Sequence, residues 1–200
     1  MRTIRAKDAG TAYAFPGPEL ARLAERGLLL RVANGYYIVV PQDMIGREWV
    51  PSLEAAAAGI ASAMYGATHA ILMGISAARL LGAIPRALAT AVIAVPDQHR
   101  PIRLKDRQAV VRFVKRDTDT LDAERIETPL GPAVVTTPEQ TVLDLAHRPQ
   151  LGDAPDEVPA AITMLYQRSD HQRLTALAAE QRLTASLRRA ESWAETQHER

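Results

Sequence analysis

The feature that most constrains the fold is an Asn-Gly pair, Asn34-Gly35, placed between two short apolar runs. Residues 28–32 and 36–40 are rich in Leu, Val, Ile and Tyr, and most of these residue types favour β-strands. Asn-Gly is the strongest short-range signal for a β-hairpin, because a type I′ turn needs a positive φ at both central residues. The sequence therefore predicts an antiparallel hairpin over residues 28–40.

Two short helices are predicted before this hairpin. Small or apolar residues at positions 6, 9, 10 and 13 share one helical face, and a Phe-Pro-Gly-Pro sequence at residues 15–18 then breaks the chain. Pro18 suits the first position of a second helix, which we expect to end near residue 26, just before Gly27. Two helices around a tight turn, followed by a hairpin, are typical of a winged helix-turn-helix, whose second helix enters the major groove of DNA.

Basic side chains in this unit suit DNA. Arg22 and Arg26 lie four positions apart on the outer face of the predicted second helix, within reach of base edges or phosphates. The full set of candidate DNA-binding residues is Arg2, Arg5, Lys7, Arg22, Arg26, Arg31, Asn34 and Tyr36. The alternative is an ordinary solvated helix on which Glu19 and Glu25 neutralise the arginines, and helix-turn-helix patterns also occur in protein–protein modules.

The charged residues are unevenly distributed along the 200-residue chain. Its 24 Lys and Arg and 23 Asp and Glu give a net charge of +1, which excludes a uniformly basic protein. The regional balances are +3 over residues 1–40, −2 over 41–78, +7 over 79–116 and −7 over 117–200. Such separation predicts two surfaces with different partners, one of them polyanionic, unless the acidic helices simply have solvated faces.

A polar connector bounded by prolines, residues 41–51, separates the N-terminal unit from the rest of the chain. We therefore expect two domains, a winged helix-turn-helix DNA-binding domain over residues 1–45 and a C-terminal α+β domain over residues 46–200. The predicted fold class is α+β: the N-terminal winged helix-turn-helix is followed by a larger mixed domain of helices, a small sheet and C-terminal helices.

Caps, turn residues and apolar runs predict the elements of the second domain. Ser52 caps a helix to about residue 64, and Ser76 caps a second helix that ends at Gly82. The expected strands cover residues 91–95, 109–115, 126–130 and 132–135. Three terminal helices are expected over residues 159–167, 171–180 and 183–197.

One further helix has a clear beginning. Thr137 can cap it, Pro138 occupies its first position, and Gln140 completes a capping box. Pro149 ends the apolar pattern that follows. The sequence therefore predicts a helix from Thr137 to just before Pro149.

The chain is predicted to be cytoplasmic and not to enter a membrane. Residues 55–78 carry no charge and are long enough to cross a bilayer, but their small and polar residues favour a buried helical hairpin. The first 15 residues lack the apolar stretch of a signal peptide. The absence of cysteine excludes disulfides and thiolate metal sites.

Signals for catalysis are weak. The five histidines show no metal-ligand spacing, and no glycine-rich phosphate-binding loop is present. The sequence around Ser76 loosely resembles a nucleophile elbow, with Asp144 and His147 downstream, but the motif needs a second glycine and a preceding strand. We therefore expect a binding protein rather than an enzyme, with no cofactor and no metal.

Three segments in the same order resemble AbiEi-type antitoxins. They are LAERGLLLRVANGYY at residues 23–37, GISAARLLG at 74–82 and TPEQTVLDLA at 137–146. The resemblance runs from about residue 3 to residue 187. It implies an N-terminal winged helix that represses its own operon by binding DNA, and a C-terminal domain that counteracts a co-encoded nucleotidyltransferase-like toxin. It supplies no catalytic residue.

The resemblance also gives the basic segment 79–116 a role. Its candidate residues for a secondary basic surface are Arg86, Arg100, Arg103, Lys105, Arg107 and Arg112. They could extend the DNA footprint or meet an acidic or RNA-binding partner, and binding through phosphates would depend steeply on salt. The alternatives for the whole chain are a protein-interaction module and a ligand-sensing winged-helix regulator without antitoxin activity.

Overall fold

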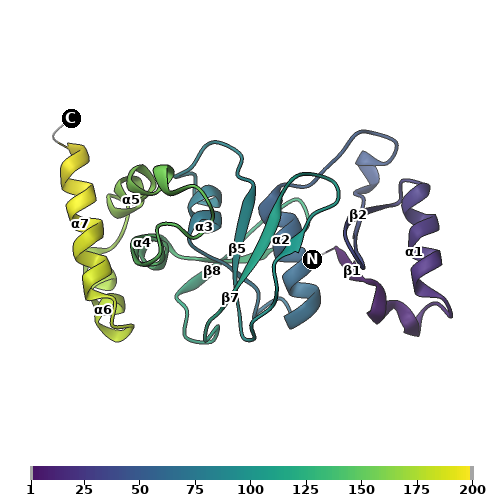
Figure 1. Ribbon diagram of the computed structural model, residues 1–200, viewed down its shortest axis with the longest axis horizontal. Coiled ribbons are helices and arrows are strands. Elements are labelled where there is room, and N and C mark those ends of the chain that lie inside the picture. Colours follow the sequence, from purple (N-terminus) through teal and green to yellow (C-terminus); the bar gives the residue numbers. More distant parts are fainter. Residues whose placement is uncertain (1, 199–200) are drawn as a thin grey trace.

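The computed structural model describes residues 2–198 of the chain. Figure 1 shows an elongated molecule with the N-terminal elements at one end, a β-sheet in the middle and a group of helices at the other end. The elements follow one another along the long axis in roughly their order in the sequence. The N-terminal unit and the terminal helices therefore lie on opposite sides of the central sheet.

The N-terminal unit contains a small antiparallel sheet. Its elements are β1 (Thr3–Arg5), the 3-10 helix η1 (Ala6–Thr11), α1 (Pro16–Glu25), β2 (Leu29–Ala33) and β3 (Tyr36–Val39). Both β1 and β2 pair with β3, in the order β1-β3-β2. The predicted hairpin and second helix are confirmed, whereas the first predicted helix is a single short 3-10 helix that follows an unpredicted strand.

The turn of the hairpin differs from the prediction. Gly35 has a φ of 76°, but Asn34 has no positive φ, and the register shifts between Arg31 and Ala33. The predicted type I′ turn is therefore wrong, because that turn needs two left-handed residues. A turn joined to a bulge needs one left-handed residue, which Gly35 supplies without the strain that a side chain would add.

The central sheet has six strands in the order β6-β7-β5-β4-β9-β8. They are β4 (Ile71–Leu72), β5 (Thr90–Val95), β6 (Ile102–Arg103), β7 (Val110–Lys115), β8 (Ala123–Ile126) and β9 (Ala133–Thr136). Pairing is parallel between β5 and β7 and between β4 and β9, and antiparallel elsewhere. The predictions of β5, β7 and β9 are confirmed.

The strand predicted at residues 126–130 is displaced towards the N-terminus. β8 ends at Ile126, and the chain then turns, with the Gly131 N–H donating to the Thr128 carbonyl and the Thr128 hydroxyl donating to the Gly131 carbonyl. These two hydrogen bonds fix a turn where the sequence pattern alone favoured a strand.

Helices cover both faces of the central sheet (Figure 1). α2 (Leu53–Tyr65) packs on one face, and α3 (Ile75–Leu80) and α4 (Pro138–His147) pack on the other. Alternate residues of β5 contribute to the two cores, and every residue of this strand is buried. A strand covered on both faces reads as a continuous apolar run, as it does here.

The uncharged segment 55–78 is not the helical hairpin that was predicted. It folds as most of α2, strand β4 and the start of α3, because Ile71 and Leu72 pair with β5 on one side and with β9 on the other. None of the helices in the described part of the chain is both long and apolar enough to cross a membrane.

The helix caps are partly as predicted. Ser52 Oγ accepts from the Ala55 N–H at 3.2 Å, and Thr137 Oγ1 accepts from the Gln140 N–H at 3.3 Å. Ser76 does not cap α3, because Gly74 occupies the cap position and Ser76 Oγ instead accepts from the Val92 N–H at 2.8 Å. This bond ties α3 to the central strand.

The predicted capping box of α4 is also wrong. The Thr137 N–H donates to the Asp122 carbonyl at 3.1 Å. Gln140 therefore does not reach back to it. Its amide instead contacts Asp144 and Gln181.

The terminal helices confirm the prediction. They are α5 (Val158–Tyr166), α6 (His171–Glu180) and α7 (Thr184–His198), and the remaining 3-10 helices are η2 (Gln42–Met44) and η3 (Pro155–Glu157). Apolar residues of α5, α6 and α7 join the same core as α3 and α4. These helices therefore extend the core away from the sheet.

The N-terminal sheet packs on α2 rather than standing apart. Val32 and Ile38 belong to the same buried cluster as the alanines of α2. The Arg2 N–H donates to the Leu130 carbonyl at 3.2 Å, and the Lys105 N–H donates to the Val32 carbonyl at 2.8 Å. Strand β2 and the residue directly before β1 are thus hydrogen-bonded to the rest of the molecule.

Candidate nucleic-acid interface

Helix α1 presents two arginines on its outer face. Its inner face buries Leu20 against Leu29 of the hairpin, which leaves Arg22 and Arg26 exposed. Arg22 Nη2 lies 2.8 Å from Glu19 Oε2, whereas Arg26 forms no ion pair with any residue between 2 and 198. The neutralisation considered above therefore applies to Arg22 and not to Arg26.

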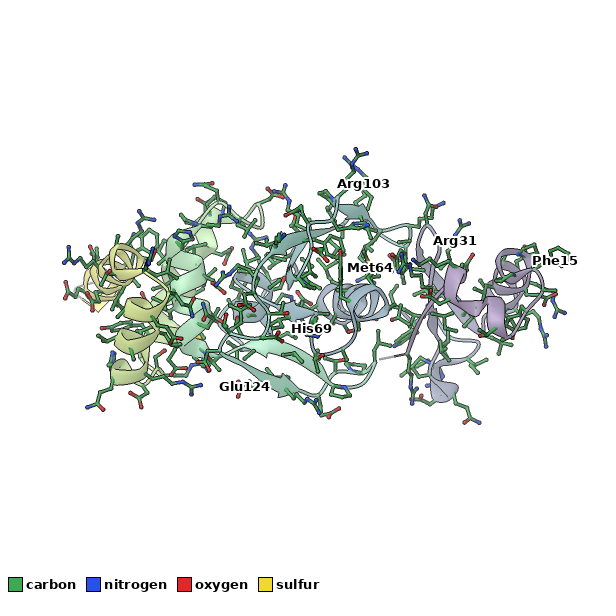
Figure 2. All side chains as sticks on the ribbon, turned by 90° about the horizontal axis from the view of Figure 1, so that it is seen from below. Phe15, Arg31, Met64, His69, Arg103 and Glu124 are labelled. Atoms are coloured by element: carbon green, nitrogen blue, oxygen red, sulfur yellow. The ribbon has the colours of Figure 1, made fainter. Side chains whose placement is uncertain are left out.

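An aromatic side chain marks the start of α1. Phe15 is the residue before the first turn of the helix, and 74% of it is exposed. It lies at the outer end of the molecule (Figure 2). From the sequence, Phe15 was placed in the break between two helices and was not named as a candidate site residue. The two prolines that follow it were the sign that its side chain does not join the apolar face of the helix.

Basic and polar side chains are also exposed on the hairpin and on either side of β1. Arg31 and Asn34 are exposed, and Arg31 Nη2 donates to Asn34 Oδ1 at 3.4 Å. Arg2 and Lys7 are exposed as well. These four residues are therefore accessible to a partner.

The placement of Tyr36 corrects the expectation that its side chain faces a ligand. Tyr36 flanks the turn, but only 8% of it is exposed, because it packs in the core between the hairpin and α2. The guanidinium carbon of Arg5 lies 6.0 Å from the centre of its ring. Burial raises the pKa of the Tyr36 hydroxyl, and the nearby Arg5 charge opposes that shift.

Three of the six basic residues predicted for the secondary surface have acidic partners. Arg86 pairs with Glu157, Arg107 with Asp106 at 2.7 Å, and Arg112 with Asp153 at 2.8 Å. The other three are exposed and form no ion pair in the described part of the chain; they are Arg100, Arg103 and Lys105. The balance of +7 over this segment therefore overstates the charge that is free to attract a partner.

The unpaired cations of the two parts of the molecule lie close together. The backbone bond from Lys105 to Val32 places the loop after β6 against β2, next to Arg31. Arg31 and Arg103 project from the same edge of the molecule in Figure 2. We call Arg31, Arg103 and Lys105 the bridging basic surface, and a surface of this charge suits an anionic partner.

The structure does not assemble the serine, aspartate and histidine that loosely resembled a hydrolase. Ser76 is buried and bonded to Val92, Asp144 contacts Arg116 at 3.1 Å, and His147 Nδ1 lies 3.4 Å from the hydroxyl of Ser186. Between residues 2 and 198, no three metal-ligating side chains are grouped.

Comparison with known families identifies the second part of the chain. Residues 69–195 match the AbiEi antitoxin C-terminal domain, and this match covers more than half of the sequence. The chain therefore belongs to the AbiEi antitoxin family, whose members are components of toxin–antitoxin systems. Antitoxins of this family are generally not enzymes.

A solved structure shares the fold. The RV2827C protein from Mycobacterium tuberculosis is similar with a TM-score of 0.62 and 19% sequence identity, over 98% of this chain and 72% of that one. At this identity the similarity concerns the fold alone. No curated protein matches the sequence.

Proposed function

We propose that this antitoxin binds operator DNA through its N-terminal unit and represses its own operon. The observation that carries the proposal is α1, whose inner face is buried on the hairpin while Arg22 and Arg26 face outward. The succession β1-η1-α1-β2-β3 and the sheet order β1-β3-β2 suit a winged helix-turn-helix, which we assign to residues 1–45. Residues 46–200 are then the antitoxin domain.

The roles of the side chains follow from their accessibility. α1 enters the major groove, where Arg26 is free to read a base. Arg22 gives up its ion pair with Glu19 and contacts the DNA instead. Phe15, at the leading end of the helix, offers apolar contact to a thymine methyl group. Arg2 and Lys7 contact phosphates, and they position the unit without reading the sequence.

The bridging basic surface extends the DNA footprint beyond the N-terminal unit. Arg103 and Lys105 carry no acidic partner among the described residues, so that they can neutralise phosphates without first breaking an ion pair. Each neutralised phosphate adds about 0.9 to the slope of log affinity against log salt. We expect Arg103→Ala with Lys105→Ala to lower this slope by about 2 while the preferred DNA sequence stays the same. An unchanged slope would show that Arg103 and Lys105 do not contact the DNA.

A gel-shift titration on the DNA upstream of the operon tests repression. The wild-type chain binds this DNA in preference to unrelated DNA at moderate salt, and Arg22→Ala with Arg26→Ala abolishes the preference. Arg188→Ala is the matched control, because Arg188 is an exposed arginine on α7 at the far end of the molecule. Equal binding to all DNA by the wild type, or an unaffected double variant, contradicts the proposal.

The proposed partner of the C-terminal domain is a co-encoded nucleotidyltransferase-like toxin, which the chain counteracts in the cytoplasm. Membership of the antitoxin family supports a toxin partner. We expect co-expression of the chain to restore growth to cells that produce the toxin encoded by the adjacent gene. Growth arrest in the presence of a folded, expressed chain contradicts this pairing.

A further inference from the structure

We propose that a groove on the α4 side of strands β6 and β7 binds a single strand of RNA. The groove begins at Arg103, which belongs to the bridging basic surface, and leads across β7 to Arg148 at the end of α4. It lies outside α1 and the hairpin. This binding is therefore additional to the proposed contact between the N-terminal unit and operator DNA.

The register of the strands places the groove on one face of the sheet. Arg103 of β6 is paired with Val110 of β7, and directly paired residues point to the same face. Side chains alternate along a strand, so Arg112 and Val114 share this face with Val110. Val111 points the other way, into the core that contains α2. The groove is therefore built on the sheet face opposite to α2.

The charge of the groove suits a polyanion. Its volume is about 480 Å³, and three arginines but no acidic residue are among the described residues that line it. Arg103 and Arg148 are exposed and form no ion pair with the described residues. Arg112 is held by Asp153, whose two carboxylate oxygens accept from Arg112 Nη2 at 3.0 and 2.8 Å. Two cations are thus available directly, and the third becomes available when it leaves its carboxylate.

The groove is apolar between the arginines. Val110, Val114 and Leu151 line it together with Pro101. Grooves that bind single strands combine cations that follow the backbone with surfaces that receive the bases. A strand carries one phosphate per nucleotide, so cations spread along a groove can each meet a different phosphate. A duplex keeps its bases stacked inside and cannot lay them on this apolar floor.

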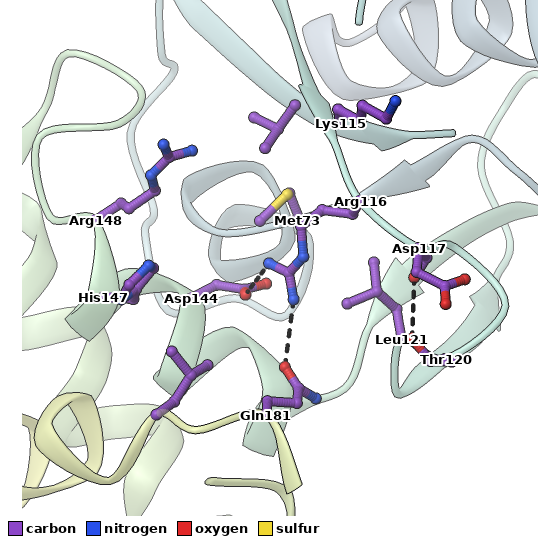
Figure 3. A pocket seen from close by; sticks show the side chains of 12 residues that line it. Met73, Lys115, Arg116, Asp117, Thr120, Leu121, Asp144, His147, Arg148 and Gln181 are labelled. Carbon is purple, nitrogen blue, oxygen red and sulfur yellow. Dashed lines mark hydrogen bonds and ion pairs between the residues drawn. The ribbon is translucent and has the colours of Figure 1, made fainter. Parts of the chain in front are cut away.

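A second cavity continues the groove beyond Arg148. It has a volume of about 390 Å³ and shares Val114 and Arg148 with the first cavity. Figure 3 shows Arg148 and His147 on the same side of this second cavity. Burial and the charges of Arg148, Arg116 and Arg189 lower the pKa of His147, as a positive potential does. The positive charge therefore extends past the first cavity.

A glutamine at the groove favours RNA over DNA. The Gln98 side chain lines the first cavity, and its Nε2 donates to the Phe113 carbonyl at 3.0 Å and to the His99 carbonyl at 3.1 Å. These bonds hold the amide in place, while its Oε1 accepts no hydrogen bond from the described residues. The ribose 2′-hydroxyl is a donor for such an oxygen, and DNA lacks it.

Fluorescence anisotropy of the full chain with a labelled oligouridylate of about 12 nucleotides tests the proposal, because this RNA has little structure of its own. We expect a Kd below about 100 μM at moderate salt, and binding of the oligodeoxyuridylate of equal length at least about threefold more weakly. An RNA Kd above about 100 μM overturns the proposal. A smaller difference between the two strands contradicts the choice of RNA.

Variants then assign the contacts. Arg112→Ala with Arg148→Ala is expected to lower the RNA affinity about tenfold or more, and to lower the slope of log affinity against log salt by about 1.4, because each phosphate of a single strand contributes about 0.7. Arg148→Ala alone breaks no ion pair in the described part of the chain and should give about half of this change in slope.

The controls separate this proposal from the proposed function. The double variant should bind operator DNA as the wild type does, because Arg103, Lys105 and α1 are unchanged, so loss of RNA binding and loss of operator binding are measured independently. Arg188→Ala on α7 is the matched control with wild-type affinity for RNA. RNA binding that survives the double variant unchanged refutes the groove.

Discussion

At the residue scale, Asp144 shows how burial and a single arginine compete. Removal from water raises the pKa of its carboxyl to about 6, and Arg116 and Gln140 oppose the rise. Burial is the larger effect because the carboxyl lies wholly inside the molecule. The folded chain therefore holds this proton more tightly than the unfolded chain.

The sign of the resulting pH dependence follows directly. Because the folded state binds the proton more tightly, Asp144 lowers the free energy of unfolding as the pH rises from about 4 to about 6, by about 3 kcal/mol in all. We expect Asp144→Asn to remove this fall. Urea unfolding at a series of pH values measures it as the difference between the two proteins.

That difference isolates Asp144 from its neighbours. Burial and the charges of Arg148 and Arg116 lower the pKa of His147, but His147 is present in both proteins and its effect is shared. Parallel curves of unfolding free energy against pH for the two proteins would show that Asp144 is not held in the environment described above.

Single residues also mark the limit of sequence reasoning about the candidate site. Arg26 and Arg31 could be placed on exposed positions from local periodicity alone. Tyr36 could not, because its burial depends on α2, which follows later in the chain. The partner of Arg112 could not be found either, since Asp153 lies 41 positions away and only the fold brings them together.

At the element scale, α2 and α3 are joined by a partly buried ion pair. Arg79 Nε lies 3.2 Å from Glu54 Oε1, and 2% of the Glu54 side chain is exposed. Removal of the arginine leaves a buried carboxylate without its counter-charge, and such a loss costs about 3 kcal/mol.

Arg79→Ala is therefore expected to lower the free energy of unfolding by about 3 kcal/mol. Chemical denaturation measures the change. Arg79→Ala with Glu54→Gln is the matched control and should be less destabilised than the single variant, because no unpaired charge remains. Equal losses in the two variants would mean that packing, rather than charge, joins these helices.

Some helices and strands could be predicted from the local sequence, and others could not. α2, α4 and α6 could be predicted because a side chain caps each of them, and prolines or a glycine also lie at the ends of α2 and α4. β4 and β6 could not, because each has two residues and is defined by its neighbours in the sheet. The six-stranded order depends on these two short strands, so the sequence predicted a smaller sheet.

At the scale of the whole molecule, a glycine in α2 sets how closely the two parts approach. A Cβ on Gly59 would overlap the hydroxyl of Thr3 and lie 3.2 Å from its Cβ. Inside a helix, alanine is more stabilising than glycine by about 1 kcal/mol. A loss of stability on replacing Gly59 by alanine would therefore indicate the overlap with Thr3.

We expect Gly59→Ala to lower the free energy of unfolding by about 1–3 kcal/mol, because the added methyl group pushes β1 away from α2. Thr3→Ala with Gly59→Ala should recover most of this loss, since the overlapping hydroxyl is gone. Urea unfolding measures both. A single variant more stable than the wild type would show that the two parts do not meet at Gly59.

The two hydrogen bonds that join the small sheet to the rest of the molecule also concern self-association. β1 and β2 are the outer strands of that sheet, and free outer strands invite pairing with another copy of the chain. Here the Lys105 N–H engages the edge of β2 at Val32, and the Leu130 carbonyl accepts from Arg2, the residue directly before β1. The loop that carries Lys105 thereby covers part of the β2 edge against pairing with another copy, while α1 remains free to meet a partner.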